Sequence, residues 1–253
     1  MVNRRQNGST RWKSSNCHWG GSGIGKGIAK AFVDEGCSVV IAARDSQRLD
    51  DAVDDLKSSP GTITSIPTDV TDEEQMVSLF SKTMNQFGRL DILVNNSGAF
   101  DGGPVEDLTM EQWQRVMQVN VTGPFLGARE AFKIMKKQGG GRIINIGSIA
   151  AQKPRHSSSP YTTSKHAVWG LTQSLALEGR DHGIAVSALH PGNVMVERRG
   201  DGKSATGRDE GPEPLISTED MGRTALLMAT LPADANMLEA IVLPVNQQYL
   251  GRG

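Results

Sequence analysis

The chain has 253 residues, in which 27 lysines and arginines are balanced by 28 aspartates and glutamates, so its formal net charge is −1. A balanced charge argues against a protein that binds nucleic acid mainly by neutralising phosphates. The length fits one α/β domain, and a chain of this size buries about 70–75% of the surface that it exposes when unfolded. We therefore expect a single domain over residues 1–253, with one sizeable core and no nucleic-acid partner.

The sequence also lacks the patterns of membrane, secreted and metal-binding proteins. No run approaches the roughly 20 apolar residues that span a membrane, and the first residues lack the apolar stretch of a secretory signal. Cys17 and Cys37 are too few for a disulfide framework and lack the companions of a zinc site. We expect a cytoplasmic protein without membrane contact, disulfides or a bound metal.

Short β-branched runs alternate with amphipathic segments from Gly23 onward. This alternation predicts the βαβ units of a parallel sheet that is covered by helices on both faces. The predicted strands are 38–43, 62–67, 91–95, 142–146, 184–190 and 240–245. No internal repeat, low-complexity tract or linker divides the chain, so the expected fold class is a single-domain α/β protein.

Two segments between these strands have apolar residues at helical spacing, which predicts two helices that each bury one face. Thr71, with Glu74 three residues later, predicts a capping box at the start of the second helix, and Gly88 predicts its C-terminal cap. The apolar residues are Leu49, Ala52, Val53 and Leu56 in the first segment, and Met76, Leu79, Phe80, Met84 and Phe87 in the second.

A glycine-rich turn opens the first helix. It consists of Gly21, Ser22, Gly23, Ile24 and Gly25, and an amphipathic segment follows it. Glycines allow the backbone to approach a pyrophosphate at a helix N-terminus, where N–H groups and the helix dipole favour an anion. Plain tight turns have a similar composition, so the surrounding sequence has to decide between the two interpretations.

The strand predicted over 38–43 ends about 20 residues after this turn, where a dinucleotide-binding fold selects its cofactor. An acidic residue there would bond the ribose 2′-hydroxyl of NAD(H), whereas an arginine would accept the 2′-phosphate of NADP(H). Arg44 follows Ala43 and therefore favours NADP(H) over NAD(H). Alternatively, Arg44 only begins a solvated helix beside Asp45.

Residues 193–216 form the one irregular stretch of the chain. They are rich in charge, glycine and proline, and they precede a helix that Ser217 or Thr218 would cap. Such a stretch is typical of a mobile lid over a substrate site or of an ordinary surface loop. We expect the choice of substrate to depend on this stretch and on the shape of the pocket.

Several motifs occur in a fixed order along nearly the whole chain. They are the glycine-rich turn, the pair Asp69 and Val70, the run Asn95, Asn96, Ser97 and Gly98, the polar residues Asn120, Ser148, Tyr161 and Lys165, and the pair Pro191 and Gly192 followed by Val194. In this order they resemble the motifs of the short-chain dehydrogenases/reductases. The resemblance implies a Rossmann-like doubly wound parallel β-sheet with helices on both faces, and a homo-oligomer that is commonly a tetramer or a dimer.

The resemblance also implies a role for each motif. Asp69 and Val70 would contact the adenine of the cofactor. Asn120, Ser148, Tyr161 and Lys165 would form a catalytic tetrad, of which Tyr161 and Lys165 also contact the cofactor. The remaining cofactor-binding residues would be those of the glycine-rich turn with Arg44, Asn96, Ser97, Gly98, Pro191, Gly192 and Val194.

The chemistry of Tyr161 and Lys165 follows from their spacing. They are four residues apart, which places them on one face of a helix, one turn from each other. A tyrosine hydroxyl has an ordinary pKa near 10, and a neighbouring ammonium favours the phenolate and so lowers that value. Tyr161 is therefore the candidate proton donor for the reduction of a ketone, a role that typically contributes about 10² to 10⁴-fold to the rate.

Two further polar residues support this pair. Ser148 follows the strand predicted over 142–146 and would hydrogen-bond the substrate oxygen, unless it only satisfies its own turn. Asn120 lies in the apolar pattern of a long helix, where a polar group needs a partner. The resemblance gives Asn120 a water that leads to Lys165, and the alternative is a hydrogen bond that bends its own helix.

Two positions depart from the pattern of the family. The family often has a threonine at the place of Val196, where it touches the pyrophosphate, so we expect a weaker cofactor contact in this chain. Ser97 stands in place of the usual alanine, and its added hydroxyl has no obvious consequence.

The segment before the glycine-rich turn departs further. A central strand that is buried on both faces should be a β-branched run, but residues 10–19 read Thr-Arg-Trp-Lys-Ser-Ser-Asn-Cys-His-Trp. Burying such side chains without partners would cost several kcal/mol, against a total stability of about 5–15 kcal/mol. We therefore expect this segment to disrupt the first strand.

The genetic code offers an explanation for this segment. Asn16, Cys17, His18, Trp19 and Gly20 are encoded by AAY TGY CAY TGG GGN, and reading this string one base later allows Ile-Val-Thr-Gly. The second reading supplies the end of a β-branched strand and the Thr-Gly that the family has before its turn. We expect a frameshift over this segment, and the alternative is a divergent but genuine N-terminus.

The motifs together favour an oxidoreductase that uses NADP(H) to interconvert a carbonyl and a secondary alcohol in a small molecule, with a tyrosine as general acid/base. A second hypothesis is a cofactor-binding sensor or scaffold without turnover, because fold does not imply function. A third is an inactive version of such an enzyme, caused by disruption of the first strand. The presence of all four tetrad residues favours the enzyme, since a protein without turnover has no physical need of them.

Overall fold

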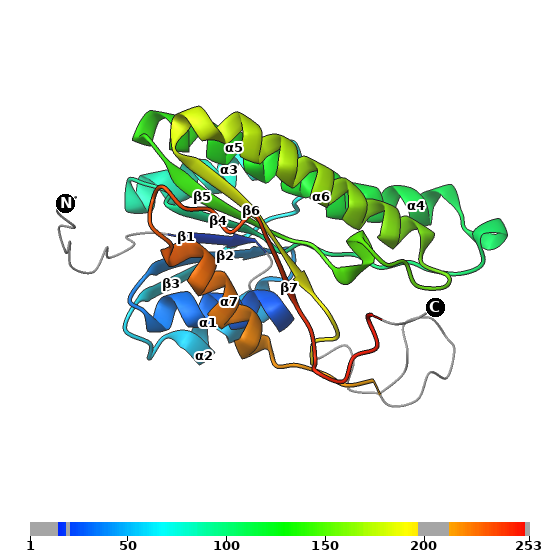
Figure 1. The fold of residues 1–253 in the computed structure, drawn as a ribbon. Coiled ribbons are helices and arrows are strands. Elements are labelled where there is room, and N and C mark those ends of the chain that lie inside the picture. Colours follow the sequence, from blue (N-terminus) through cyan, green and yellow to red (C-terminus); the bar gives the residue numbers. More distant parts are fainter. Residues whose placement is uncertain (1–14, 19–20, 197–212, 251–253) are drawn as a thin grey trace, which may run out of the picture.

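The computed structural model describes residues 15–18, 21–196 and 213–250, with residues 15–18 described by their backbone. In this part of the chain seven strands form one parallel sheet (Figure 1). Their order is β3-β2-β1-β4-β5-β6-β7. The strands are β1 Ser15–His18, β2 Ser38–Ala43, β3 Thr62–Pro67, β4 Ile92–Asn95, β5 Gly141–Ile146, β6 Ile184–Pro191 and β7 Glu239–Val242.

Helices lie against both faces of the sheet (Figure 1). One layer contains α1 Gly23–Asp34, α2 Ser46–Leu56 and α7 Thr218–Thr230, and the other contains α3 Glu73–Phe87, α5 Gly123–Gln138 and α6 Ser159–Gly179. The remaining α-helix, α4 Met110–Met117, continues into α5 through a π-helical turn, η2 Gln118–Thr122. Three short 3-10 turns complete the described helices, η1 Val105–Asp107, η3 Ile149–Ala151 and η4 Arg180–His182.

Alternate residues of a strand face the two layers. On β2, Val39 and Ile41 belong to the core under α1, α2 and α7, whereas Val40 and Ala42 belong to the core under α3, α5 and α6. All four side chains are at most 1% exposed. Burial on both sides is what the continuous apolar strands predicted, and the α/β fold with a parallel sheet and helices on both faces is confirmed.

The start of α3 differs from the prediction. Its N-cap is Asp72 and not Thr71, because the Asp72 side chain accepts a hydrogen bond from the Gln75 N–H at 3.1 Å. Thr71 donates its hydroxyl to a neighbouring carboxylate instead, so the predicted capping box with Glu74 does not form. The C-terminal cap is confirmed, since Gly88 has the left-handed φ of +73° that such a cap requires.

The other boundaries follow the prediction closely, with one larger difference. β4, β5 and β6 each differ from the predicted ranges by one residue at one end, and Ser217 caps α7 in a capping box with Asp220. β7 ends at Val242, whereas the prediction extended to residue 245. Pro244 explains the difference, because proline has no N–H with which to continue the ladder of hydrogen bonds.

A strand does form in the segment whose polar sequence predicted disruption. β1 pairs in parallel with β2 on one side and with β4 on the other, and Cys17 lies opposite Ile41 and Val94. β1 is therefore an interior strand of the sheet. The rest of that segment, residues 10–14 and 19, lies outside the described residues.

None of the described helices is long and apolar enough to cross a membrane. Within the same residues, no group of three or more His, Cys, Asp or Glu side chains is placed to hold a metal ion. Cys37 is a free thiol and only 2% exposed, and its burial raises the pKa of that thiol to about 11. A thiol with so high a pKa is a poor nucleophile.

Candidate active site

The carboxyl ends of the strands border a cavity of about 770 Å³. In an open α/β sheet such a cavity forms where the strand order reverses, which in this sheet is between β1 and β4. Ser148, Tyr161 and Lys165 line it together. The predicted cofactor-binding residues in its lining are Gly21, Ser22, Gly23, Ile24, Asn96, Ser97, Gly98, Pro191, Gly192 and Val194.

The glycine-rich turn presents the N-terminus of α1 to this cavity. Gly23 has a left-handed φ of +53°, and a Cβ added there would come within 3.2 Å of the Val196 side chain. The Ser22 side chain makes no capping hydrogen bond. The turn places the positive end of the helix dipole at the cavity, where it favours an anion such as the pyrophosphate of a dinucleotide.

Tyr161 and Lys165 lie one turn apart near the start of α6, as their spacing predicted. The Lys165 ammonium is 5.6 Å from the centre of the Tyr161 ring, and it donates a hydrogen bond to the Ile146 carbonyl at 2.9 Å. Lys165 is 4% exposed. Burial lowers the pKa of Lys165 below its ordinary value, and the neighbouring Tyr161 opposes this effect.

A second aromatic ring, which the sequence analysis missed, packs against Tyr161. The Phe100 ring centre lies 5.3 Å from that of Tyr161, at an interplanar angle of 57°. Arg115 fixes the loop that carries Phe100, because it pairs with Asp101 and donates to the Phe100 carbonyl at 3.1 Å. Phe100 had no signal in the sequence, since its contact with Tyr161 joins residues that are far apart in the chain.

Ser148 begins the short η3 turn directly after β5. Its hydroxyl oxygen accepts a hydrogen bond from the Ala150 N–H at 3.1 Å, so Ser148 does satisfy its own turn. That bond uses one lone pair and leaves the hydroxyl proton for another acceptor. The local role and the proposed role toward a substrate oxygen are therefore compatible.

Asn120 lies outside the cavity lining, in the π-helical turn η2, and it is 0% exposed. Its amide accepts from the Ala99 N–H at 2.7 Å, donates to the Ala99 carbonyl at 2.9 Å, and donates to the Ser164 hydroxyl at 2.9 Å. These bonds join η2 to the loop after β4 and to α6. A bond that only bends the helix of Asn120 is thus the wrong alternative.

Ser97 has a definite partner, contrary to the sequence interpretation. Its hydroxyl donates to the Val119 carbonyl at 3.0 Å, one residue before Asn120. In a π-helical turn the regular hydrogen-bond ladder is interrupted, so a side-chain donor at this point satisfies a backbone acceptor. The hydroxyl that replaces the usual methyl side chain therefore links the loop after β4 to η2.

Four other predicted cofactor residues also lie outside the lining of the cavity. Gly25 is buried within α1, and Val70 is buried against the backbone of Gly123. Asp69 accepts two hydrogen bonds from the residue two positions later. Arg44 is exposed directly after β2, at the place where the cofactor prediction put it.

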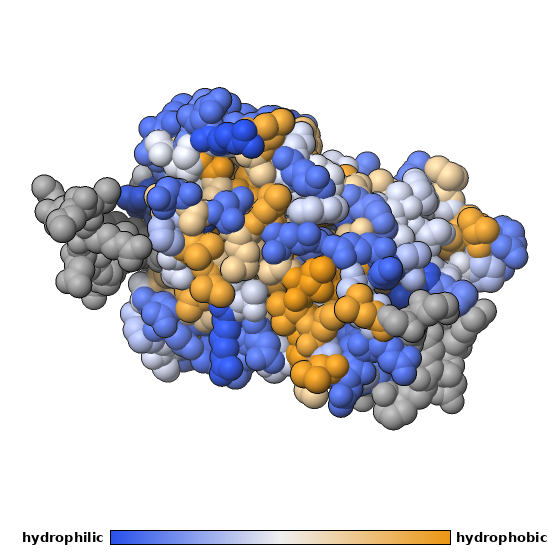
Figure 2. Space-filling view, in the orientation of Figure 1, coloured by the Kyte–Doolittle hydropathy of each residue, from blue (hydrophilic) through white to orange (hydrophobic). Residues whose placement is uncertain are grey.

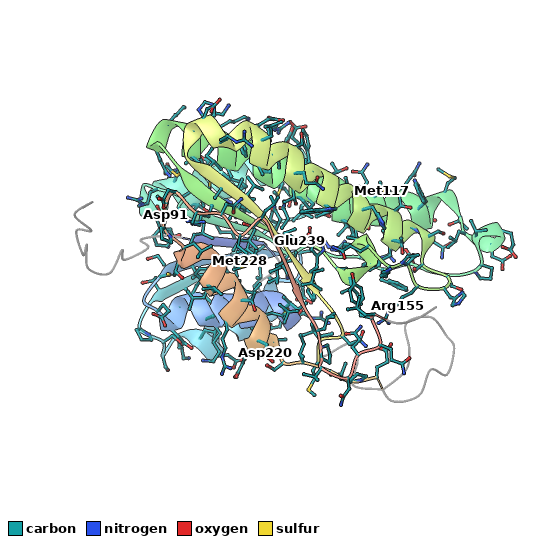
Figure 3. The ribbon with its side chains drawn as sticks, in the orientation of Figure 1. Asp91, Met117, Arg155, Asp220, Met228 and Glu239 are labelled. Carbon is teal, nitrogen blue, oxygen red and sulfur yellow. The ribbon has the colours of Figure 1, made fainter. Side chains whose placement is uncertain are left out.

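Gln247, near the C-terminus, contacts the turn after β6, and the sequence did not indicate this contact. The Asn193 N–H donates to the Gln247 side-chain oxygen at 2.9 Å, and a Cβ at Gly192 would come within 2.2 Å of the same oxygen. Arg155, labelled in Figure 3, donates to Asn193 Oδ1 at 2.6 Å and pairs with Glu213 at 3.0 Å. It thus links the two ends of the predicted lid, whose residues 197–212 lie outside the described residues.

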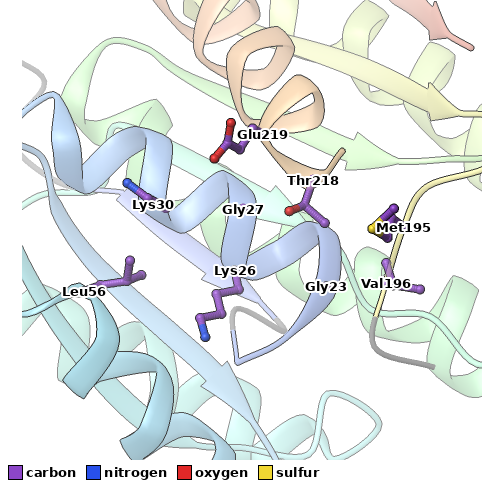
Figure 4. Close-up of a pocket in the computed structure, with 9 residues that line it drawn as sticks. All are labelled: Gly23, Lys26, Gly27, Lys30, Leu56, Met195, Val196, Thr218 and Glu219. Atoms are coloured by element: carbon purple, nitrogen blue, oxygen red, sulfur yellow. The ribbon is translucent and has the colours of Figure 1, made fainter. Parts of the chain in front are cut away.

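A second hollow of about 500 Å³ lies beside the glycine-rich turn (Figure 4). It shares Gly23, Lys26 and Val196 with the larger cavity. Lys26 pairs with Asp55, and its neighbour Lys30 pairs with a carboxylate on its own helix. Because Ser148, Tyr161 and Lys165 line only the larger cavity, we place the candidate active site there.

The comparisons with known proteins agree on one family. Residues 19–205 match the family model described as short chain dehydrogenase. The chain is 41% identical over 175 residues to the oxidoreductase YxjF of Bacillus subtilis, covering 69% of this chain and 68% of that protein. It is 38% identical over 192 residues to glucose 1-dehydrogenase 2 of the same species, covering 74% of each.

The fold is also similar to that of solved structures. A variant of actinorhodin polyketide ketoreductase, crystallised with NADPH, matches it with a TM-score of 0.83 and 26% sequence identity. The match covers 93% of this chain and 98% of that one. The likeness therefore includes the sheet, both helix layers and the edge of the sheet at which the cavity lies.

Proposed function

The chain belongs to the short-chain dehydrogenase/reductase family, and from this premise we propose that it transfers a hydride between NADP(H) and a carbonyl or secondary-alcohol substrate. The family makes it an oxidoreductase with an NAD(P)-binding fold. The observation that carries the finer proposal is the placement of Tyr161 beside the buried Lys165, in the same cavity as Ser148. These three side chains supply what protonation of a substrate oxygen requires.

Reduction of a carbonyl needs a hydride at carbon and a proton at oxygen. NADPH, when bound, supplies the hydride. Tyr161 donates the proton from its hydroxyl, and Lys165 holds positive charge next to the phenolate that remains. Ser148 donates its hydroxyl to the same substrate oxygen, which positions the oxygen and stabilises the charge that develops on it. Oxidation of an alcohol runs through the same groups in reverse.

The test of this proposal is a panel of ketones and aldehydes, with NADPH consumption followed in the purified protein. Turnover of any member above the rate of the Tyr161→Phe variant supports the enzyme. Binding of NADPH without turnover across the panel would favour the second candidate, a cofactor-binding sensor or scaffold. The complete tetrad favours the enzyme between the two.

Arg44 is proposed to set the cofactor preference. A charge-assisted hydrogen bond to the 2′-phosphate contributes about 1.5–3 kcal/mol, or roughly a ten- to hundredfold preference for NADPH. Arg44→Asp should reverse that preference, as measured by the dissociation constants of NADPH and NADH. Arg223→Asp makes the same charge change on the exposed side of α7 and should leave both constants unchanged. An unmodified protein that binds NADH as tightly as NADPH would contradict this role.

Lys165 is expected to serve both the proton donor and the cofactor. Lys165→Met removes the ammonium and keeps most of the volume of the side chain, so we expect kcat/KM to fall at least about a hundredfold and NADPH to bind more weakly. The melting temperature is measured alongside, because the variant removes a buried charge but also leaves the Ile146 carbonyl without its hydrogen bond. The exposed Lys137→Met is the matched control. Weaker NADPH binding in the control as well would mean that net charge, and not the position of Lys165, explains the effect.

We also propose a homo-oligomer. Figure 2 shows apolar side chains gathered over α7 and β7 on the near face. Leu227, Leu238 and Ile241 are 38–52% exposed there, and β7 is an edge strand of the described sheet. Edge strands and exposed apolar areas are typical of surfaces that bind another chain. Light scattering of the purified protein should give a mass of at least two chains.

A further inference from the structure

His190 lies directly behind the backbone of Ser148. It is on β6 and 0% exposed, and its ring packs edge-to-face with that of Trp169, with ring centres 5.6 Å apart. His190 Nδ1 is 3.2 Å from the Ser148 amide nitrogen and 2.9 Å from the Ser148 carbonyl oxygen. A Cβ at Gly147 would come within 2.3 Å of the same Nδ1, so the imidazole ring fills the space that this glycine leaves open.

The second ring nitrogen of His190 faces a carboxylate. Nε2 lies 3.5 Å from Glu239 Oε1, which is within ion-pair distance but is too far for a hydrogen bond of normal length. It is the one buried side-chain nitrogen or oxygen without a hydrogen-bond partner among the described residues. Glu239, labelled on β7 in Figure 3, is about 30% exposed.

The Glu239 oxygen that faces His190 has a second partner. The Gln152 side chain donates a hydrogen bond to Glu239 Oε1, and the Tyr249 hydroxyl donates to Gln152 Oε1 at 2.5 Å. The chain of contacts therefore runs from the end of the sequence, through β7, to the backbone of Ser148.

The position of the proton on His190 decides which part of Ser148 it bonds. With the proton on Nδ1, the ring donates to the Ser148 carbonyl and turns the lone pair of Nε2 toward the Glu239 carboxylate, which repels it. With the proton on Nε2, the ring faces Glu239 favourably and Nδ1 accepts from the Ser148 N–H, while the Nδ1 lone pair also faces the Ser148 carbonyl oxygen at 2.9 Å. The Ser148 carbonyl and the Glu239 carboxylate therefore favour opposite tautomers, and the carboxylate selects the form with the proton on Nε2 because it carries a full charge.

The electrostatic surroundings keep the ring neutral at neutral pH. Burial lowers the pKa of His190, the Ser148 hydrogen bond and Glu239 oppose this, and Lys165 on α6 lowers it further. A neutral ring has a single N–H, so the two tautomers exclude each other. The tautomer therefore decides whether His190 bonds the Ser148 N–H or the Ser148 carbonyl.

We propose that His190 and Glu239 are positioning residues for Ser148: Glu239 fixes the His190 tautomer with its proton on Nε2, and His190 Nδ1 then holds the Ser148 N–H. Neither residue touches the substrate in this scheme. The inference rests on the proposed function to the extent that Ser148 acts on a substrate oxygen, but the tautomer itself is a property of the protein alone.

The experiment compares Glu239→Gln with Glu178→Gln, which makes the same change on the exposed side of α6. Nitrogen-15 NMR of histidine side chains reports the tautomer directly. His190 should have its proton on Nε2 in the unmodified protein and in Glu178→Gln, and should shift toward the Nδ1–H form in Glu239→Gln. The signals are assigned by their loss in His190→Asn or, where that variant does not fold, by replacing the four other histidines one at a time.

Kinetics then test the path through His190. Glu239→Gln should lower kcat roughly three- to tenfold with unchanged NADPH affinity, because Ser148 is displaced and the cofactor site is not. In His190→Asn the asparagine oxygen can still accept from Ser148, so adding Glu239→Gln to that variant should cost no further rate. An equal loss in both backgrounds, or a tautomer that is the same in all proteins, would overturn the proposal. A shifted tautomer in a protein that reduces no carbonyl would refute the proposed function alone.

Discussion

Tyr161→Phe is expected to lower hydride transfer at least about a hundredfold while NADPH affinity stays within about twofold. The substitution removes one oxygen and keeps the ring, so the contacts with Phe100 and with the Lys165 side chain are retained. What is lost is the proton donor. In its absence the oxygen of the reduced substrate has to take its proton from water, which is poorly positioned for the transition state.

The measurement is the single-turnover rate at saturating NADPH, together with the dissociation constant of NADPH from its fluorescence. Thr163→Val, on the exposed side of the same turn of α6, controls for disturbance of the helix and should keep the full rate. A Tyr161→Phe protein with near full activity would refute the assignment of the proton donor. Loss of cofactor binding in parallel with the rate would instead indicate that the hydroxyl holds the cofactor.

The features predicted best from the sequence are those that depend on local patterns. The ranges of β2 to β6 were predicted to within one residue, and for the interior strands the reason is that a strand buried on both faces is largely apolar. The cap at Gly88 follows equally from a local rule. The cap at Asp72 was misplaced by one residue because Thr71, an equally good cap in sequence, is used by a neighbouring carboxylate.

The parts of the site that were missed depend on contacts between distant segments. His190 and Ser148 are 42 residues apart in the sequence, and Gln247 and Asn193 are 54 apart. No period or motif in one sequence indicates such pairs, since they exist only after the strands have been ordered in the sheet. The hydrogen bond of Ser97 was missed for the same reason. Its hydroxyl donates to the Val119 carbonyl, which η2 leaves without a regular helical partner.

The second prediction with a large expected effect concerns the stability of β1. β1 lies between β2 and β4, and the residues paired with it, such as Ile41, Leu93 and Val94, are at most 1% exposed. The helix layers cover this part of the sheet on both sides. A position with such neighbours favours β-branched residues, whereas the sequence there is Ser-Asn-Cys-His. The match to the family model begins at residue 19, directly after this strand.

A protein rebuilt with Ser15→Val, Asn16→Ile, Cys17→Val, His18→Thr and Trp19→Gly is expected to be several kcal/mol more stable than the unmodified chain. Each buried Val or Ile contributes about 1.5–3 kcal/mol, and removing polar groups from the middle of the sheet adds to this. NADPH should also bind more tightly, because β1 leads directly into the glycine-rich turn. Urea denaturation and NADPH fluorescence measure the two effects.

The codons of residues 14–21 provide an independent test of the same idea. We expect the gene to carry a one-base slip that is undone near the guanine-rich codons of Trp19, Gly20 and Gly21, with Ile-Val-Thr-Gly in the other frame. Two results would defeat this account. One is that sequencing of both the gene and the purified protein confirms residues 14–21 as they stand, in a protein as stable and as active as the rebuilt one. The other is a shifted frame with a stop codon inside the strand, because no β-branched strand could then have been read from it.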